Sequence, residues 1–287
     1  MFDNARLQMQ NYPARNSSSQ SSRSWLERQS KDPYVQKAQE LGLPSRAYFK
    51  LQEINEQHYS ASVNKKSKKN KSTSSSNRRM IQPNMLVLDL GAAPGGWSLY
   101  VSTEIDPTLG GGIVAVDLLP LNLDISTRIE DNVGGRFEFV QGDFTQNKIR
   151  LEVMDRFARL SKETQSTEDG QRDLSTQRKA NLIVSDMAAN FLGDSKTDAI
   201  RTINLCEQAL SFAAGDGCFD SSYSPKEDQG MLLKDGSFLC KYFSCGKDNE
   251  QELMDAAKRV FKSVHSFKPK ASRKESSEMY LLGYSKL

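Results

Sequence analysis

The sequence predicts an α/β fold in which a mostly parallel β-sheet carries helices on both faces. An apolar run at Leu86–Leu90 ends in a glycine-rich turn, which indicates a buried parallel strand leading into a helix. Four further apolar runs alternate with helical patterns, as in β-α-β units. The last two apolar runs enclose a polar stretch and indicate an antiparallel hairpin at one edge. We therefore expect seven strands.

The length allows one large domain or two small ones, and the strand-like runs that continue from Leu86 to Tyr284 without a break favour one. The chain has 287 residues, with 39 lysines and arginines against 36 acidic residues, for a net charge of +3. The basic residues cluster, which is typical of proteins that bind a polyanion. Four cysteines without C-x-x-C spacing and two histidines favour neither a metal site nor disulfides, and so indicate a reducing compartment. No run approaches the ~18 apolar residues of a membrane span.

The N-terminal segment differs in composition from the rest of the chain. Residues 1–30 are rich in arginine and serine, and their only acidic residues are Asp3 and Glu27. This composition is typical of an organellar transit peptide followed by a disordered arm. It also fits an ordinary flexible terminus, which Asp3 favours. We predict a transit peptide or arm over residues 1–24 and a single domain over residues 25–287.

Two helices are expected before the first strand. Asp32 precedes a proline suited to a first helical turn, and Ser45 can cap a second helix over residues 45–58. Lys50 lies on the apolar stripe of this second helix, so its side chain either extends past the core edge or points into a site. Residues 64–79 carry seven basic residues and no acid. They indicate a solvated insertion that either contacts phosphates or is simply disordered.

The turn after the first strand is suited to a ligand. Gly91, Gly95 and Gly96 lack a Cβ, so the backbone can approach a bound molecule closely. Ala93 stands where a dinucleotide motif has its second glycine, and no Gly-Lys-Ser/Thr of a P-loop follows. The turn therefore favours a nucleoside-type cofactor without a pyrophosphate, although a corner without any ligand has a similar pattern.

Polar groups follow four later strands, and together they predict a site at one edge of the sheet. Each of them alone is common at a strand end, but ligands bind at the carboxyl edge of open α/β sheets. The groups are Asp117 after residues 112–116, Asp143 after residues 137–140, Asp186 after residues 182–184, and Lys241 after residues 238–240. Asp117 is also placed about 20 residues past the glycine turn, where an acidic residue commonly binds ribose hydroxyls.

The remaining segments are read as helices, insertions and the final hairpin. Helical patterns cover residues 145–160, 195–214 and 249–262, and polar insertions are expected near residues 60–80, 161–179 and 216–230. The hairpin strands are expected at residues 264–267 and 279–282. Its tip is basic and either contacts phosphates or is a solvated loop; the basic residues are Lys268, Lys270, Arg273 and Lys274.

Seven segments resemble the FtsJ/RrmJ family of S-adenosyl-L-methionine-dependent 2'-O-ribose RNA methyltransferases. They occur in family order over nearly all of residues 25–287: SRAYFKLQEI (45–54), LDLGAAPGGWS (88–98), VDLLP (116–120), QGDF (141–144), SDMAAN (185–190), GSFLCKYF (236–243) and SSEMY (276–280). The resemblance implies a Rossmann-like class I methyltransferase fold with S-adenosyl-L-methionine as the cofactor. Ala189 departs from the proline that is usual in the family.

The resemblance also implies the site residues. It places a catalytic tetrad at Lys50, Asp186, Lys241 and Glu278. Together with the glycine turn, it places cofactor contacts at Gly91, Gly95, Trp97, Asp117, Asp143 and Asp186. Trp97 is either one of these contacts or part of the core. Lys241 acts either as the base that accepts the ribose proton or as a charged group that stabilises the alkoxide.

Residues 24–39 are most similar to the branch that modifies large-subunit rRNA in bacteria and mitochondria. With the arginine- and serine-rich terminus, this similarity predicts a monomeric enzyme of the mitochondrial matrix. Its expected substrate is a uridine in the A-loop of the peptidyl transferase centre, in large-subunit rRNA or the assembling mitochondrial large subunit. Three alternatives are open. They are a tRNA methyltransferase of the same family, a non-catalytic assembly factor, which the intact tetrad disfavours, and a nicotinamide oxidoreductase, which Ala93 disfavours.

Overall fold

The computed structural model describes residues 30–58, 79–163, 179–224 and 230–287. The predicted arm at residues 1–24 and the greater part of the insertions predicted near residues 60–80 and 161–179 lie outside these ranges. The insertion predicted at 216–230 is described except for residues 225–229.

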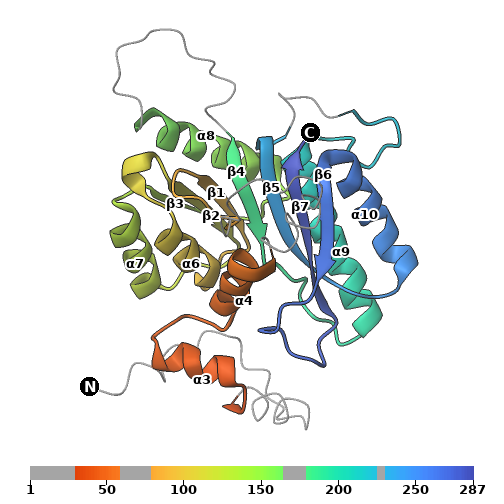
Figure 1. Cartoon of the computed structure of the whole chain (residues 1–287), viewed down its shortest axis with the longest axis horizontal. Coiled ribbons are helices and arrows are strands. Elements are labelled where there is room, and N and C mark those ends of the chain that lie inside the picture. The colour runs from red at the N-terminus through yellow and green to blue at the C-terminus, as the bar shows by residue number, and fades with distance from the viewer. Residues whose placement is uncertain (1–29, 59–78, 164–178, 225–229) are drawn as a thin grey trace, which may run out of the picture.

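Seven strands form one sheet with the order β3-β2-β1-β4-β5-β7-β6 (Figure 1). The first five in this order pair in parallel, whereas β7 is antiparallel to both of its neighbours. The strands are β1 (Leu86–Leu90), β2 (Gly112–Asp117), β3 (Phe137–Gln141), β4 (Ala180–Ser185), β5 (Leu232–Phe243), β6 (Phe261–Phe267) and β7 (Glu278–Lys286). The predicted mostly parallel seven-stranded sheet with an antiparallel edge hairpin is confirmed.

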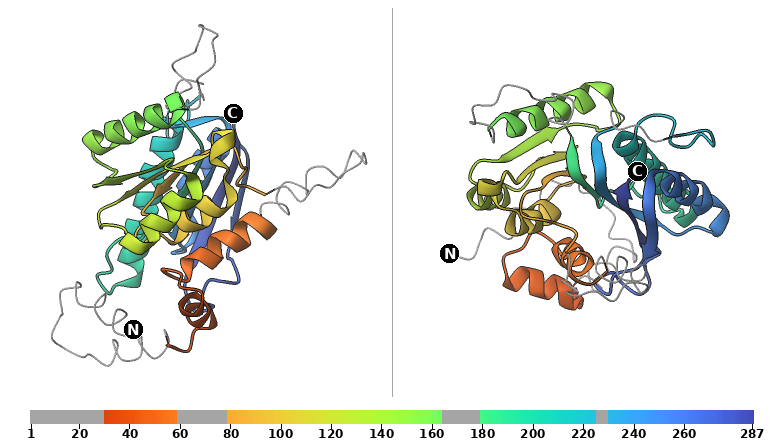
Figure 2. Two further views of the ribbon diagram at one scale, coloured as in Figure 1. Left: turned by 90° about the vertical axis from the view of Figure 1, so that its left-hand side faces the viewer. Right: turned by 45° about the horizontal axis from the view of Figure 1, so that its top comes forward.

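Helices cover both faces of the sheet (Figure 2). One face packs against α8 (Asn147–Glu163), α9 (Ser195–Ala214) and α10 (Lys247–Val260). The other face packs against α4 (Ala47–Glu53), α6 (Gly96–Glu104) and α7 (Leu123–Val133). Because both faces are covered, the inner strands bury nearly every side chain, which explains the continuous apolar runs in the sequence.

The segment before the sheet consists of α3 (Pro33–Glu40), α4 and a single π-helical turn, η1 (Ile54–His58). Helix α3 begins at Pro33, as the sequence predicts, and Asp32 caps it by accepting a hydrogen bond from the Tyr34 amide at 3.0 Å. Within α4, Lys50 is buried along with its apolar neighbours Phe49 and Leu51. Of the two alternatives for Lys50, the structure therefore favours a side chain that points into the molecule.

Several segments differ from the sequence-based expectations. The second helix begins at Ala47 rather than at Ser45, with Arg46 and not Ser45 as its N-cap, and it becomes π-helical after Glu53. Helix α7 was not predicted; it is mostly polar and buries only Ile125, Ile129 and Val133, at four-residue spacing. The last helix ends at Val260 rather than at residue 262, because the Phe261 ring stacks on Phe238 at 6.2 Å and begins β6. Helix α8 continues through residues 161–163, where an insertion was expected to begin. A short 3-10 turn, η2 (Pro107–Leu109), precedes β2.

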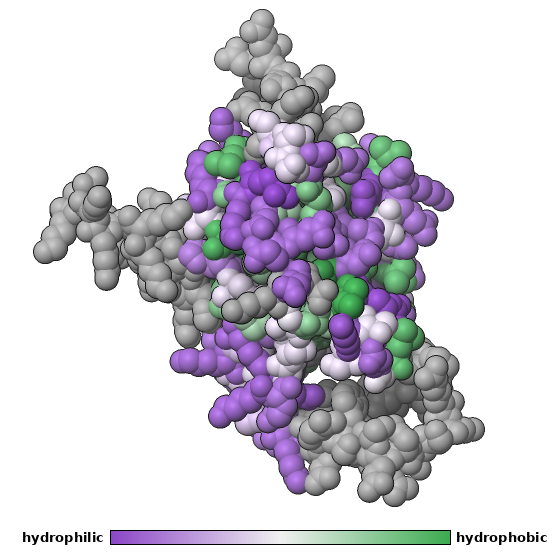
Figure 3. Space-filling view, turned by 90° about the vertical axis from the view of Figure 1, so that its right-hand side faces the viewer, coloured by the Kyte–Doolittle hydropathy of each residue, from purple (hydrophilic) through white to green (hydrophobic). Residues whose placement is uncertain are grey.

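The outer side of the hairpin edge is predominantly polar. Figure 3 shows this side of the molecule, where hydrophilic residues cover most of the surface and hydrophobic ones stand singly. Within the described part of the chain, none of the helices has the length and hydropathy that a membrane crossing requires.

Candidate active site

Two lysines and two carboxylates from distant parts of the chain meet in one cluster. Lys50 Nζ donates a hydrogen bond to Glu278 Oε2 at 2.8 Å and lies 3.9 Å from Asp186 Oδ1. Lys241 Nζ lies 3.1 Å from the same Asp186 oxygen and also donates to the Asp186 carbonyl. The structure thus brings together all four residues of the predicted tetrad.

The sheet topology places these side chains side by side. β4 and β5 are parallel with Ser185 opposite Cys240, so Asp186 follows β4 next to Lys241 on β5. β7 runs the other way and pairs Lys241 with Tyr280, so Glu278 begins β7 near the point where β5 ends. Lys50 reaches the cluster from α4, which lies at this end of the sheet in Figure 1.

Three residues of the cluster are almost fully buried, the Asp186 side chain is 17% exposed, and each charge has an opposite partner. Lys50 and Lys241 are each 7% exposed and Glu278 is 8% exposed. Burial by itself favours a raised pKa for Asp186, but the Lys241 and Lys50 ammonium groups and the Tyr280 hydroxyl hold this pKa below its ordinary value. Asp186 is therefore charged and fixes the positions of both lysine amines.

Two residues that the sequence reasoning missed complete the cluster. Tyr280 donates from its hydroxyl to Asp186 Oδ1 at 2.8 Å. Burial raises the pKa of Tyr280 well above its ordinary value and the nearby carboxylates raise it further, so the hydroxyl keeps its proton. Ser272 donates to Glu278 Oε1. A signal for Tyr280 was present, because it stands two residues after Glu278 on a strand and so shares its face.

The predicted glycine turn is packed too closely for side chains. Gly91 has φ of +80°, and a Cβ there would stand 2.2 Å from Met187 Cγ. Gly95 has φ of +109°, and a Cβ there would stand 2.6 Å from Ile125 Cγ2. Since other residues rarely adopt positive φ, both positions need glycine for the backbone conformation as well as for the space.

Asp117 and Asp143, both predicted to contact the cofactor, hold the loops that follow β2 and β3. Asp117 accepts hydrogen bonds from the Ala93 and Leu119 amides, each at 2.8 Å, and so ties the glycine turn to the end of β2. Burial raises the pKa of Asp117. Asp143 Oδ1 accepts from the amide and the hydroxyl of Thr145 at 3.0 and 2.7 Å. Carboxylate oxygens have two lone pairs each, so these bonds leave capacity for a ligand.

Trp97 packs into the core between the glycine turn and the cluster. Trp97 is only 2% exposed, and its indole Nε1 donates a hydrogen bond to the Ala47 carbonyl at 2.9 Å. Its ring lies 5.9 Å from that of Tyr280. These contacts join α6 to α4, the helix that carries Lys50, so the core alternative describes at least part of its role. A cofactor contact by Trp97 stays a prediction.

Asp89 is a further candidate that the sequence reasoning did not single out. It lies within β1, is 0% exposed, and accepts from Ser98 Oγ at 2.6 Å through Oδ2. Its other oxygen, Oδ1, is buried without a hydrogen-bond partner. Burial raises the pKa of Asp89 to about 7, against the opposing effect of the Ser98 hydrogen bond. The sequence contained a signal for Asp89, because this residue is the polar one inside the otherwise apolar run LVLDL.

These residues fit S-adenosyl-L-methionine. An unpartnered buried carboxylate oxygen is costly unless a ligand satisfies it, and the oxygen belongs to the strand that leads into the glycine turn. S-adenosyl-L-methionine carries an amino group and a sulfonium, either of which suits a carboxylate. The residues that would hold it are Asp89 and the six predicted from the sequence, namely Gly91, Gly95, Trp97, Asp117, Asp143 and Asp186. In the described ranges, no group of three or more His, Cys, Asp or Glu side chains is arranged to bind a metal ion.

Asp89 predicts a pH-dependent loss of stability in the cofactor-free protein. A folded-state pKa of about 7, above an unfolded value of about 3.9, means that the folded form binds more protons between these values, so stability falls as the pH rises. Asp89→Asn removes this effect. Between pH 5 and pH 8, the free energy of unfolding measured in urea should fall on the order of 2 kcal/mol more for the wild type than for D89N. Equal losses would contradict the prediction, and the exposed-site variant Asp131→Asn should behave as the wild type.

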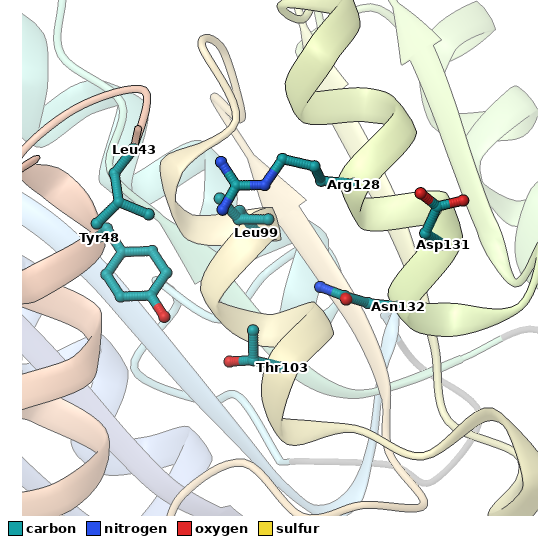
Figure 4. A pocket seen from close by; sticks show the side chains of 7 residues that line it. All are labelled: Leu43, Tyr48, Leu99, Thr103, Arg128, Asp131 and Asn132. Atoms are coloured by element: carbon teal, nitrogen blue, oxygen red, sulfur yellow. The ribbon is translucent and has the colours of Figure 1, made fainter. Parts of the chain in front are cut away.

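A shallow pocket of about 250 Å³ lies elsewhere, between α4, α6 and α7 (Figure 4). It contains none of the predicted site residues. Arg128 projects into it from α7 and donates to the Gly42 carbonyl at 2.6 Å. The arginine therefore joins the loop before α4 to α7.

Known proteins are similar in sequence to this chain over most of its length. The FtsJ-like methyltransferase family model matches residues 43–286. A Rickettsia canadensis protein named "Ribosomal RNA large subunit methyltransferase E" is 35% identical over 272 residues, covering 93% of this chain and 89% of the relative. The protein of the same name from Rickettsia rickettsii (strain Sheila Smith) is 36% identical over 269 residues, with the same coverage.

A solved structure supports the fold. The crystal structure of a Plasmodium falciparum protein described as a ribosomal RNA methyltransferase matches with a TM-score of 0.54 and 17% identity, over 85% of this chain and 98% of that one. The resemblance noted in the sequence is confirmed by the family match, which spans all four tetrad residues. The chain belongs to the FtsJ-like methyltransferase family.

Proposed function

We propose that this protein transfers a methyl group from S-adenosyl-L-methionine to a ribose 2'-hydroxyl in large-subunit ribosomal RNA. The observation that carries the proposal is the buried cluster of Lys50, Asp186, Lys241 and Glu278 at the same sheet edge as the glycine turn. The names of the two Rickettsia relatives support the choice of substrate, because each aligns over 93% of this chain.

The residues of the cluster meet the needs of this reaction. When bound, the cofactor supplies an electrophilic methyl group on its sulfonium, so the protein must align the ribose oxygen and assist loss of its proton. Alignment in a fixed geometry contributes ~7 kcal/mol or more to such a step. Asp186 holds the Lys241 amine through two contacts, one to its carboxylate and one to its carbonyl. Lys241 then either accepts the 2'-hydroxyl proton or stabilises the developing negative charge on the oxygen.

Lys50 and Glu278 keep this arrangement in place. Lys50 bridges the two carboxylates, 2.8 Å from Glu278 and 3.9 Å from Asp186. Ser272 holds the other Glu278 oxygen. With both carboxylates partnered, the cluster presents amines in a fixed position, and the target ribose binds beside them.

The hairpin tip and the first helices supply RNA contacts. Arg273 Nε donates a hydrogen bond to Asp32 Oδ2 at 3.1 Å, and Lys268 Nζ donates one to the Lys274 carbonyl at 2.9 Å. The exposed Lys270 and Lys274 are thus the tip residues suited to phosphate contacts. Such contacts position RNA without reading its sequence. The lysine-rich stretch at residues 64–79 lies almost wholly outside the described residues, and its contact with RNA stays a prediction.

In finer detail, we propose a uridine of the A-loop as the target and the mitochondrial matrix as the location. The similarity of residues 24–39 to the bacterial and mitochondrial branch supports this, as does the composition of the first 30 residues. The partner is then large-subunit rRNA or the assembling mitochondrial large subunit, bound by a monomer.

Mapping of 2'-O-methyl groups after loss of the protein tests the proposal. Mitochondrial rRNA, cytosolic rRNA and tRNA from cells with and without the gene are compared at nucleotide resolution. We expect loss of one methyl group, in mitochondrial large-subunit rRNA, and its return with wild-type protein but not with Lys241→Ala. Loss from tRNA alone would favour the tRNA alternative, and return with K241A would favour a non-catalytic role.

A further inference from the structure

Two large apolar side chains are exposed in the loop that follows Asp186. Phe191 is 66% exposed and Leu192 is 70% exposed. Exposed apolar residues that stand singly need no explanation, but these two are adjacent and lie five and six positions after a residue of the catalytic cluster.

The loop that carries them is held firmly. The Asp198 carboxylate accepts hydrogen bonds from the Leu192 amide at 2.7 Å and the Gly193 amide at 3.1 Å, and Asp198 is itself only 3% exposed. Arg201 donates to the Asn190 carbonyl at 2.7 Å. The exposed side chains are therefore presented from a fixed backbone, which lowers the entropy cost of binding a partner.

Phe191 lies against a second aromatic residue beside Lys241. Its ring centroid is 5.8 Å from that of Phe243, at an interplanar angle of 51°. The Lys241 amine lies 5.9 Å from the Phe243 ring centroid. Phe243 is the last residue of β5, two positions after Lys241 and on the same face of the strand. The Phe191–Phe243 pair thus extends from the catalytic amine toward solvent.

This arrangement suits a nucleobase. The amine belongs to Lys241, which is only 7% exposed. To reach it, a ribose must leave the regular stacking of its strand, so its base or the neighbouring base loses a stacking partner. An exposed phenylalanine ring restores that stacking for any base, because every base has an aromatic face. We infer that Phe191, supported by Phe243, stacks on an unstacked RNA base at or next to the methylated nucleotide. This inference rests on the proposed function, since it assigns a substrate contact to the same site.

The variant Phe191→Ala tests the inference in the full-length protein. With large-subunit rRNA transcribed without modifications as the probe, we expect the Kd and the KM for RNA to rise about tenfold or more. The affinity for S-adenosyl-L-methionine and the melting temperature should stay at wild-type values, because the side chain is exposed. Phe191→Trp should retain RNA binding, since a larger ring still stacks. The matched control is Leu151→Ala, which removes a 63% exposed apolar side chain from α8 and should change neither constant.

The outcomes separate this inference from the proposed function. If the wild type methylates rRNA and F191A has the same Kd and KM for RNA as the wild type, the stacking role is overturned and the proposed function is unaffected. If the wild type binds RNA but transfers no methyl group, the function fails, and the Kd of F191A still decides the stacking role. Unchanged binding of naked rRNA with reduced activity only on precursor large subunits would assign this surface to a ribosomal protein, and would also overturn the inference.

Discussion

Replacement of Lys241 by alanine is expected to lower the rate of methyl transfer by about 10³-fold and to leave cofactor binding nearly unchanged. Of the two lysine amines, that of Lys241 is the one that Asp186 holds more closely, through a 3.1 Å ion pair and a hydrogen bond to the Asp186 carbonyl. Its removal takes away the group that we propose receives the proton or stabilises the alkoxide. Asp186 keeps Lys50 and Tyr280 as partners, so the variant should fold. Single-turnover assays with labelled S-adenosyl-L-methionine measure the rate, and calorimetric titration measures cofactor affinity.

Two companion variants sharpen this experiment. Lys262→Ala removes an exposed lysine of the edge strand β6 that pairs with Asp235 of β5, and this variant should keep wild-type activity. Lys241→Arg keeps a positive charge that cannot accept a proton at neutral pH. Partial activity in K241R would identify Lys241 as a charged stabiliser, whereas inactivity equal to that of K241A favours a base. If K241A retained more than a tenth of wild-type activity, Lys241 would lie outside the reacting centre.

The variant Asp186→Asn should lose both activity and stability. One oxygen of this carboxylate contacts Lys241, Lys50 and the Tyr280 hydroxyl, and an amide cannot neutralise two buried ammonium groups. Loss of one partner from a buried ion network costs roughly 3 kcal/mol, and the displaced Lys241 amine should reduce methyl transfer by about 10³-fold. Urea unfolding at pH 7 and single-turnover assays measure the two losses.

The stability loss in D186N should depend on pH in a defined direction. The neighbouring amines hold the pKa of Asp186 below its ordinary value, so its stabilising effect is complete above the unfolded pKa of about 3.9 and disappears as the pH falls through the folded pKa. The difference between the wild type and D186N should therefore be constant near neutrality and shrink below about pH 4. A difference that instead grew on acidification would contradict the assigned charge state.

A surface ion pair provides the control for D186N. Glu138 pairs with Arg156 at 2.7 Å, and both side chains are about a quarter exposed. Glu138→Gln should lower the free energy of unfolding by less than ~1 kcal/mol, because solvent screens such a pair. If D186N were no less stable than E138Q at pH 7, the buried cluster would be held together by its surroundings rather than by its charges.

The sequence best predicted the structural features that depend on a local pattern of residues. Apolar runs predicted the strands, because strands covered on both faces must be apolar throughout. The short polar helix α7 was missed, since three buried residues among eleven give a weak pattern. Asp89 was missed because a strand buried on both faces hides the difference between a core position and a ligand position. The assignment of the tetrad depended on the family resemblance, because four of its seven short segments each contain one of the four residues.

The amino-acid sequence by itself determined the alternation of strands and helices, the glycine turn and the polar groups at the strand ends, because each depends on residues only a few positions apart. Tertiary structure alone decided that Lys50 meets Glu278, 228 positions away, and that the Tyr280 hydroxyl joins the two lysine amines on Asp186. The antiparallel pairing of β7 with β5 and the packing of α4 on the sheet set these distances. Their physical basis is burial: once the sheet and α4 exclude water, two amines and two carboxylates are stable only in contact with one another.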